Sequence, residues 1–533
     1  MSKLTSVVQK LSKSSPHAVF TPKLSSDTES KDIFDYLYIE TKIEKHYKEL
    51  LEENKTKKIV IFLCGSSGDG KSAIIGRNIN CFDEYYDVHI DATHSFKPDQ
   101  TAIEALDERF LSFKNSEKSL IVGVNIGILL NFAKEGSDEH KDIREAIQVY
   151  DKKGTSSQSI MFINFEEYSK FEMTEDAVSS PFIQKLLDNV TQSSIVNPFY
   201  EALQNDRQLG IFNSTHQNFQ LLSLEPVKKS IVELLVTVHL KYDQFLTVRS
   251  LLDFVYTLLA GGGSLIHQLF MDESNAIIEN IRKEDPCILR TEKLDTFVLE
   301  RKSKKTDEEL NAFIDEFNEM FDFPLLTLDD PHLLIRTFYL FRNDACATNY
   351  HEQFSGEFND HTTYDFVKLL YAHEQFAISS DESLIQEFYT SIEKAILAYA
   401  NKQLPHLSSE DLITLSEIND YALCTTIEFD PDWKAIETHT KHMLHSFPCF
   451  LKVNNVPIGV VSISLGMYKL IHAINAGYRP NKHDRNTIVI FEELIGRIID
   501  HAKGSRKLVV VKGDAIHEFK NNEGKIKVKT YVR

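Results

Sequence analysis

The feature that most constrains the fold of this chain is a glycine-rich loop between a short apolar run and a helical pattern. Residues 65–72 read GSSGDGKS and match the P-loop (Walker A) pattern G-x-x-x-x-G-K-[ST] at every fixed position. The run before it, KKIVIFLCG at 57–65, is typical of a strand that is buried on both faces. The residues that follow Lys71 predict a helix. This order of strand, loop and helix favours an α/β domain.

Each residue type in this loop suits the binding of a nucleoside triphosphate. Glycines permit backbone conformations in which several N–H groups converge on phosphate oxygens, and the helix start adds partial positive charge. Lys71 would reach the β- and γ-phosphates, and the Ser72 hydroxyl would bind Mg²⁺. A tight turn without a ligand would leave both residues unexplained. The expected ATP-binding residues are Gly65, Ser66, Ser67, Gly68, Asp69, Gly70, Lys71 and Ser72.

Hydrolysis of the nucleotide would also need an acidic residue at a strand end to hold the metal's water shell. Asp91 ends the strand-like run YDVHIDAT at 86–93 and is the first candidate for a catalytic and metal-binding residue. Thr93 and His94 follow it and would share its role. A helix N-cap or a strand end that faces solvent is an equally simple interpretation of Asp91.

Four further residues are candidates for catalysis. Glu166 and Glu167 form an acid pair after the strand-like run that begins at Ser159, and they are the rivals of the first candidate. Asn125 ends another such run and would contact the γ-phosphate or the attacking water. Arg249 opens a helical pattern and would present its guanidinium to the γ-phosphate, although a surface arginine fits the pattern as well.

Strand-like runs alternate with helical patterns as far as about residue 168, which predicts a parallel sheet with crossover helices. A single helix over 32–57 is expected to lead into the first strand. Mostly helical patterns continue to about residue 445, and SSEDLITLSEIND at 408–420 is one of the clearer cases. The predicted organisation is an extended arm at 1–30, a P-loop NTPase domain at 31–225, a helical lid at 226–300, a helical domain at 301–445 and an α+β region at 446–533 that ends in a basic hairpin.

The composition excludes some classes of function. The 533 residues include 42% hydrophobic and 26% charged residues, as in ordinary globular proteins. A net charge of -20 argues against a protein that coats DNA through bulk electrostatics. The exception is 503–533, which would meet DNA or form a solvated lysine-rich hairpin that resists edge pairing. Scattered cysteines, and no run near the ~20 apolar residues of a membrane span, favour a cytoplasmic protein without a membrane segment.

Six segments carry a more specific pattern: LSKSSPHAV (11–19), DYLYIETKIE (35–44), IFLCGSSGDGKSAI (61–74), IDATHSFKPDQTAIEALD (90–107), VGVNIGILLNFAKEGSDEH (122–140) and GYRPNKHDRNTIVIFEELI (477–495). Together they resemble the DptF (DndF) family of DNA phosphorothioation-dependent restriction proteins. The resemblance spans most of the chain and is strongest over 11–170.

The resemblance implies a P-loop ATPase that works in antiviral defence with DptG-like and DptH-like subunits. It implies nucleotide binding by residues 65–72 and contact with DNA only within the assembled complex. It transfers no catalytic residue beyond the loop, and the sequence has no evident nuclease motif. A nucleotide-gated scaffold or a regulatory P-loop protein that binds ATP without turnover stays the alternative.

Overall fold

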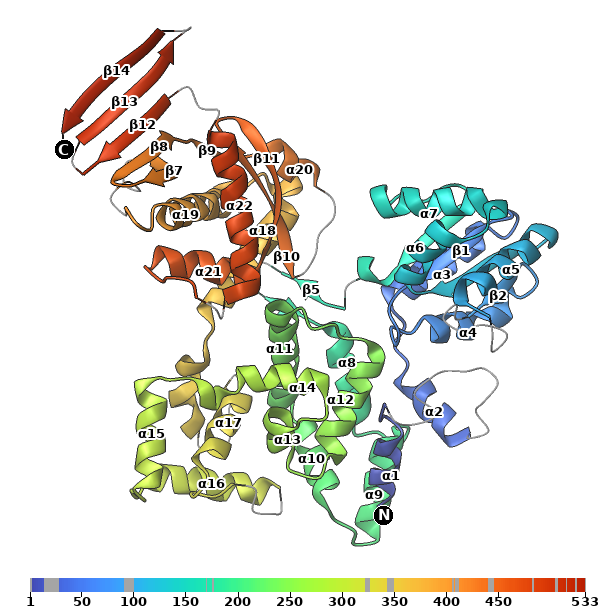
Figure 1. The fold of residues 1–533 in the computed structure, drawn as a ribbon. Helices are drawn as coiled ribbons and strands as arrows, with labels where there is room; N and C mark the ends of the chain where they lie inside the picture. Colours follow the sequence, from blue (N-terminus) through green and yellow to red (C-terminus); the bar gives the residue numbers. More distant parts are fainter. Residues whose placement is uncertain are drawn as a thin grey trace. The chain divides into compact units, whose positions relative to one another are not determined.

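The chain folds into two compact units in the computed structural model (Figure 1). The first unit comprises Met1–Glu172, Ser180–Val238 and Gln244–Phe358, and the second comprises Met173–Ser179, His239–Asp243 and Asn359–Arg533. The structure describes residues 2–13, 28–90, 100–168, 170–174, 177–321, 326–342, 349–404, 407, 412–439, 445–481, 484–503, 507–513, 515–522 and 525–532.

A four-stranded parallel sheet forms the centre of the α/β part of the first unit. The strands are β1 (Val60–Cys64), β2 (Tyr86–His89), β3 (Ser119–Val124) and β4 (Ile160–Asn164), in the order β2-β3-β1-β4. β1 and β3 are buried along their whole length, as expected for short apolar runs covered on both faces. The predicted α/β fold with a parallel sheet is confirmed.

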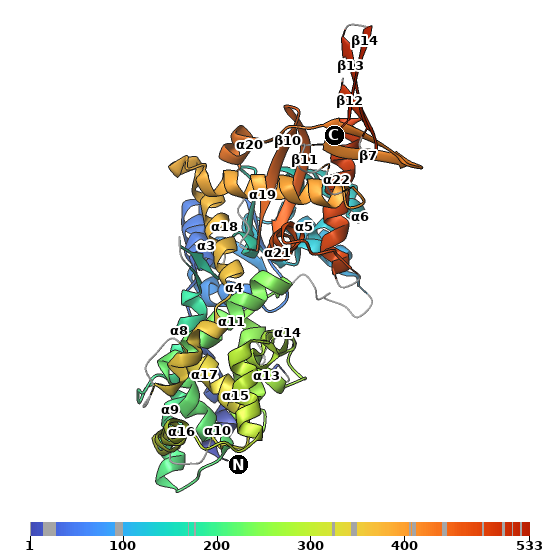
Figure 2. The same cartoon turned by 90° about the vertical axis from the view of Figure 1, so that its left-hand side faces the viewer.

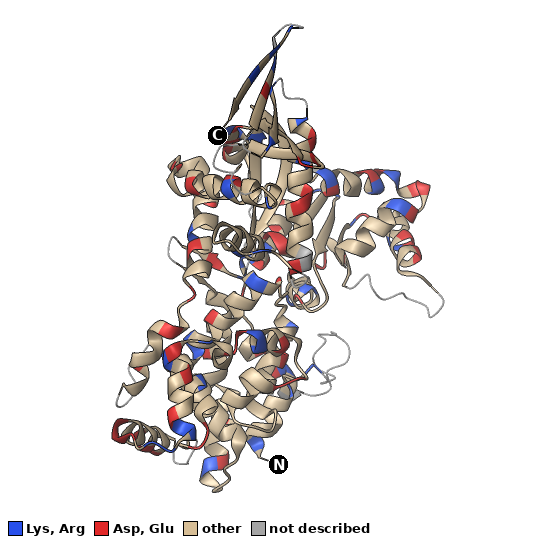
Figure 3. Ribbon diagram, turned by 60° about the vertical axis from the view of Figure 1, so that its left-hand side comes forward, with Lys and Arg blue, Asp and Glu red and all other residues tan. Residues whose placement is uncertain are grey.

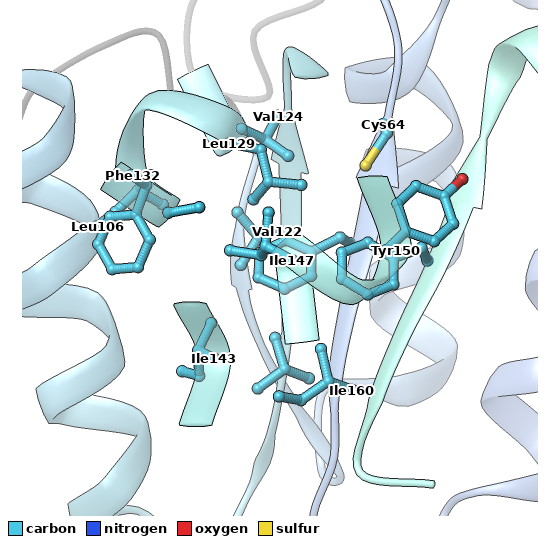
Figure 4. Packing of buried hydrophobic residues seen from close by; sticks show 14 of the residues in the cluster. Cys64, Leu106, Val122, Val124, Leu129, Phe132, Ile143, Ile147, Tyr150 and Ile160 are labelled. Carbon is cyan, nitrogen blue, oxygen red and sulfur yellow. The ribbon is translucent and has the colours of Figure 1, made fainter. Parts of the chain in front are cut away.

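Helices cover both faces of this sheet. On one face pack α5 (Ala102–Asn115), α6 (Ile126–Glu135) and α7 (Lys141–Lys153), and Figure 4 shows side chains of these helices against β3 and β4. The rings of Tyr150 and Phe162 stack there with centroids 4.2 Å apart. On the other face pack α3 (Lys42–Glu53) and α4 (Lys71–Phe82). This double cover fixes the position of the strand ends that carry the candidate site.

The N-terminal region differs from the prediction of an extended arm. Residues 2–13 contain a helix, α1 (Lys3–Gln9), whose apolar side chains are buried against α9 (Pro198–Gln208) and α12 (Val248–Ala260). The helix forms because distant parts of the chain supply a surface for those side chains, and this contact cannot be read from local sequence. Residues 14–27 of the predicted arm lie outside the described residues.

The predicted single helix at 32–57 is also wrong, because the structure contains two. α2 (Thr28–Leu37) ends before residues 38–41, and α3 begins after Thr41, which has extended backbone. Their apolar residues follow nearly the same period, and Tyr38 and Ile39 continue the apolar pattern into the break at 38–41. Short interruptions of this kind are poorly marked by periodicity.

Helices make up the remainder of the first unit after the sheet. They are α8 (Pro181–Thr191), α9, α10 (Ser214–Leu222), α11 (Glu225–Tyr242), α12, α13 (Leu265–Met271), α14 (Ala276–Ile281), α15 (Glu292–Lys302), α16 (Glu308–Met320) and α17 (Pro331–Phe341), and the end of α11 passes into the second unit. In the part of the chain that the structure describes, no helix combines the length and the apolar character needed to cross a bilayer.

The second unit joins helices to two antiparallel sheets and to the paired strands β5 (Glu172–Met173) and β6 (Val178–Ser179), of which Glu172 belongs to the first unit. Its helices are α18 (His361–Ser379), α19 (Ser383–Ala400), α20 (Trp433–Thr438), α21 (Leu465–Asn475) and α22 (Arg485–Ala502). The sheets have the orders β11-β10-β9 and β14-β13-β12-β8-β7. The strands are β7 (Leu412–Ile418), β8 (Tyr421–Thr426), β9 (Phe429–Pro431), β10 (Ser446–Val453), β11 (Val456–Ser464), β12 (Lys507–Lys512), β13 (Ala515–Asn522) and β14 (Lys525–Val532). The strand and hairpin predictions after residue 446 are confirmed.

The helix predicted over 408–420 is wrong, because its described part forms β7, which pairs with β8. The side chain of Asn401 stabilises this arrangement: its amide donates to the Leu412 carbonyl at 2.6 Å, and its oxygen accepts the Thr414 N–H at 3.0 Å. Short apolar patterns fit a helix and a strand alike, and here the partner strand decides.

Candidate functional site

The candidate site lies where three parallel strands end side by side. Cys64 at the end of β1 pairs with Val124 of β3 and with Asn164 of β4. The next residues, Gly65, Asn125 and Phe165, therefore leave the sheet at the same edge. In open α/β folds, ligands bind outside the carboxyl ends of the strands, in the crevice between the loops that follow neighbouring strands.

The glycine loop has the backbone conformation that an anion-binding loop needs. Gly68 and Gly70 have φ angles of 90° and 104°, which side chains strongly disfavour. α4 begins directly after Gly70, and no side chain caps it. An anion at the start of α4 would thus face the positive end of the helix dipole without competition from an N-cap side chain. The sequence prediction of these glycines and of the helix start agrees with the described geometry.

Lys71 lies across this loop and is nearly buried. Its ammonium donates to the carbonyl oxygens of Gly65, at 2.9 Å, and of Ser66, at 2.8 Å. The contacts hold the charge beside the loop N–H groups, where phosphate oxygens would take the place of the carbonyls. Ser72 follows in the first turn of α4 and is the residue of the loop whose hydroxyl would bind Mg²⁺.

Asp69 shapes the loop from inside. Its carboxylate is buried, and the Ser66 N–H donates to it at 2.7 Å. Lys170 approaches the other carboxylate oxygen at 3.6 Å. Burial lowers the pKa of Lys170, and Asp69 opposes that shift by favouring the charged ammonium. The pair keeps a negative charge from facing the anion site alone. No motif marks Lys170, so sequence reasoning missed it.

Gly65 is required by close packing at the mouth of the loop. A Cβ at this position would lie 2.9 Å from Cδ2 of Phe165 and 3.2 Å from an oxygen of Asp69. The first distance is shorter than carbon atoms tolerate. Phe165, which follows β4, therefore requires a glycine at position 65, directly after β1.

The start of α12 contacts the loop from the helical region of the same unit. The Arg249 N–H donates to the Gly68 carbonyl at 3.3 Å, and a Cβ on Gly68 would lie 3.0 Å from Cβ of Arg249. Thr247 caps α12 by accepting the Ser250 N–H at 3.0 Å. The structure thus brings Arg249 to the predicted loop, and its role in catalysis stays a prediction.

The other candidate residues have structural contacts of their own. Asn125 caps α6, and its side-chain oxygen accepts the Gly127 N–H at 2.8 Å. Glu167 accepts the Tyr150 hydroxyl at 2.8 Å, and burial together with this carboxylate raises the pKa of Tyr150. Glu166 is exposed in the turn after β4. All three residues follow strands at the same edge of the sheet, and two of them, Asn125 and Glu167, also stabilise the fold.

The first candidate for a metal ligand, Asp91, lies outside the described residues, as do Thr93 and His94. Among the residues that the structure describes, no three or more His, Cys, Asp or Glu side chains are grouped to hold a metal ion. The nearby Cys64 is no nucleophile at neutral pH, because burial raises the pKa of its thiol to about 12.

The described arrangement places the start of α4 and the Lys71 ammonium together at this edge of the sheet, where they would suit an anion. Comparison of the chain with protein-family models, with curated proteins and with solved structures found no match.

Proposed function

We propose that this protein binds ATP with Mg²⁺ at residues 65–72 and hydrolyses it as a subunit of a phosphorothioation-dependent DNA restriction complex. The observation that carries the nucleotide part is the loop itself. Left-handed Gly68 and Gly70 lead into an uncapped helix start, with the Lys71 ammonium beside them at the carboxyl edge of a parallel sheet. A turn that only joined a strand to a helix would not need this combination.

The restriction part of the proposal rests on the resemblance to DptF proteins. Under this proposal the protein acts in the cytoplasm, with DptG-like and DptH-like subunits, and meets DNA within their complex. The net charge of -20 supports this division, because an acidic subunit that docks on basic partners does not need to grip duplex DNA by itself.

Co-purification tests the partnership and its dependence on nucleotide. The tagged full chain is expressed with the products of the neighbouring genes and isolated with and without Mg·ATP. We expect a defined complex whose yield changes with nucleotide for the wild type and stays unchanged for Lys71→Ala. Lys185→Ala, at an exposed lysine of α8, is the matched control. Failure to retain any neighbouring gene product under either condition would contradict the restriction role.

A second candidate function is a nucleotide-gated scaffold without turnover. The observation that favours it is the engagement of two candidate side chains in the fold: Asn125 as a helix cap and Glu167 with Tyr150. The ATPase function, by contrast, requires Asp91 or Glu166 to hold the metal's water shell, with Arg249 as a further charge at the γ-phosphate.

Steady-state phosphate release separates the two functions. In the ATPase, Asp91→Ala should abolish turnover and keep ATP binding, whereas Lys71→Ala should lose both. In the scaffold, the wild type should bind ATP and release no phosphate above background. Phage plating with Asp91→Ala then shows whether turnover matters for protection.

A further inference from the structure

The C-terminal strand β14 is an exposed edge of the five-stranded sheet in the second unit. All eight of its residues are exposed. Among the described strands it pairs with β13 alone, along its full length from Asn522–Lys525 to Ala515–Val532. Figures 1 and 2 show the sheet extending beyond α19 and α22, with β14 as its outermost strand. An edge of this kind presents backbone N–H and C=O groups that another strand can pair with.

The two faces of β14 differ in chemistry. Lys525, Lys527 and Lys529 share one face, and the chain's basic residues are visible on this hairpin in Figure 3. On the other face Ile526, Val528 and Val532 are 68%, 56% and 71% exposed. The strand thus alternates positive and apolar side chains on its two sides.

The apolar face of β14 continues across the neighbouring strands. Val528 is paired with Phe519 of β13, which is paired with Leu508 of β12, and these two residues are only half-buried. On the same face, Val510 and Leu423 are half-buried in the next row, which ends in His517 and Thr530, hydrogen-bonded to each other at 3.0 Å. The opposite face is different, because there β8, β12 and β13 contribute to a buried core. Apolar side chains gathered on an open sheet face are typical of an interaction surface.

We propose that β14 is a docking edge for an extended segment of another protein that alternates acidic and apolar residues. Such a segment would add a sixth strand by pairing with the outer edge of β14. Its carboxylates would lie beside Lys525, Lys527 and Lys529, and its apolar side chains would extend the row of Ile526 and Val528.

Charge disfavours two other occupants. A second copy that paired antiparallel through a two-fold axis normal to the sheet would join lysine face to lysine face, which like charges oppose. Duplex DNA would meet Glu518 in the middle of the basic face, where it pairs with Lys507 at 2.8 Å and Lys520 at 3.7 Å. Lysines that only prevent unwanted strand pairing at an edge would explain one face of β14. The apolar face would then have no role.

A charge-swap experiment tests this proposal on the full chain. The probes are fluorescent ten-residue peptides: one alternates glutamate and valine, one alternates lysine and valine, and one has the first composition with its glutamates grouped. The variant combines Lys525→Glu, Lys527→Glu and Lys529→Glu. The control makes the same charge change at exposed lysines of the first unit, with Lys185→Glu, Lys302→Glu and Lys304→Glu.

We expect the wild type and the control to bind the glutamate–valine peptide, and the variant to bind it about tenfold more weakly or not at all. The variant should instead gain binding of the lysine–valine peptide, which shows that it is folded. Hydrogen exchange of the β14 amides should slow when the peptide binds. Equal binding of the grouped peptide, or no binding of the alternating one, would overturn the proposal. The proposal would also be overturned if the wild type and the control bound a labelled 20-base-pair DNA duplex and the β14 variant did not.

Discussion

At the scale of single residues, two glycines of the site lie so close to other side chains that a Cβ atom would collide with them. Gly65 lies under the ring of Phe165, and Gly68 lies against Arg249. The motif predicts these glycines from the backbone conformations of a phosphate loop. The neighbours that also require them come from residues 100 or more positions later, so only the structure identifies them. Lys170 belongs to the same group, because its partner Asp69 is distant in sequence.

Gly65→Ala should lower ATP affinity and destabilise the protein by about 1–3 kcal/mol, because the new methyl group overlaps the ring of Phe165. Thermal unfolding and a binding titration measure the two effects. Gly356→Ala is the control, since a Cβ there meets nothing within 4 Å. Phe165→Leu added to Gly65→Ala should restore part of the stability. Equal effects of the two alanine substitutions would show that the close packing is not real.

Asp206 gives a prediction for pH. Burial disfavours its charge, but the N–H groups of Leu4 and Lys3, at 2.8 and 2.9 Å, and His216 outweigh this and lower the pKa of the carboxyl. The unfolded value is about 3.9, so this contribution to stability is complete above about pH 5 and is lost as the pH falls through the folded pKa. Asp206→Asn should therefore be destabilised at pH 7 and approach the wild type in acid.

The measurement is chemical unfolding of both proteins between pH 3 and 7. Limited proteolysis near α1 is a second readout, because Asp206 holds the start of this helix. Asp151→Asn, at an exposed carboxylate, is the control and should follow the wild type at every pH. A stability difference that stays constant down to the lowest pH would contradict the assigned role of Asp206.

At the scale of elements, the sequence predicts what is local and misses what is not. β1, β3 and β4 are short apolar runs buried on both faces, and that pattern is readable. α1 is not readable, because its stability comes from a surface formed about 200 residues later. β7 has a periodicity that also fits a helix, and its pairing with β8 decides the outcome. In the site, the sequence predicts the loop and the strand ends, whereas the contact of α12 with Gly68 joins two distant segments.

The α12 contact leads to a matched pair of substitutions. Thr247 and Thr291 both cap helices by accepting the N–H three residues on, but only Thr247 adjoins the glycine loop. Each change to alanine should cost about 1 kcal/mol of stability. Thr247→Ala alone should also change ATP affinity, because it loosens the start of α12 against Gly68. Titrations with ATP on both variants provide the measurement, and identical affinities would argue against coupling between α12 and the loop.

At the scale of the whole molecule, two residues that lie against the loop, Thr247 and Lys170, are close in sequence to the second unit. His239–Asp243 belong to that unit, where Lys241 pairs with Asp360 at 2.9 Å, and Thr247 follows four residues later. Met173 enters the same unit three residues after Lys170. A change at the loop can therefore reach the second unit through either contact and the few residues of chain that follow it.

Hydrogen exchange with and without Mg·ATP tests this route. We expect slower exchange at 65–72 and at 247–250 when nucleotide binds, and a change in exchange at 239–243. Lys71→Ala should show none of these differences. Protection at the loop without any change at 239–243 would mean that the bound nucleotide does not act on the second unit.

The measurement that tests the central claim most directly is calorimetric titration of Mg·ATP into the full chain and into Lys71→Ala. The geometry of residues 65–72 predicts saturable binding of one nucleotide per chain by the wild type, and none by the variant at the same concentrations. No binding by a folded wild-type protein, or equal binding by both proteins, would contradict the assignment of the loop as a nucleotide site.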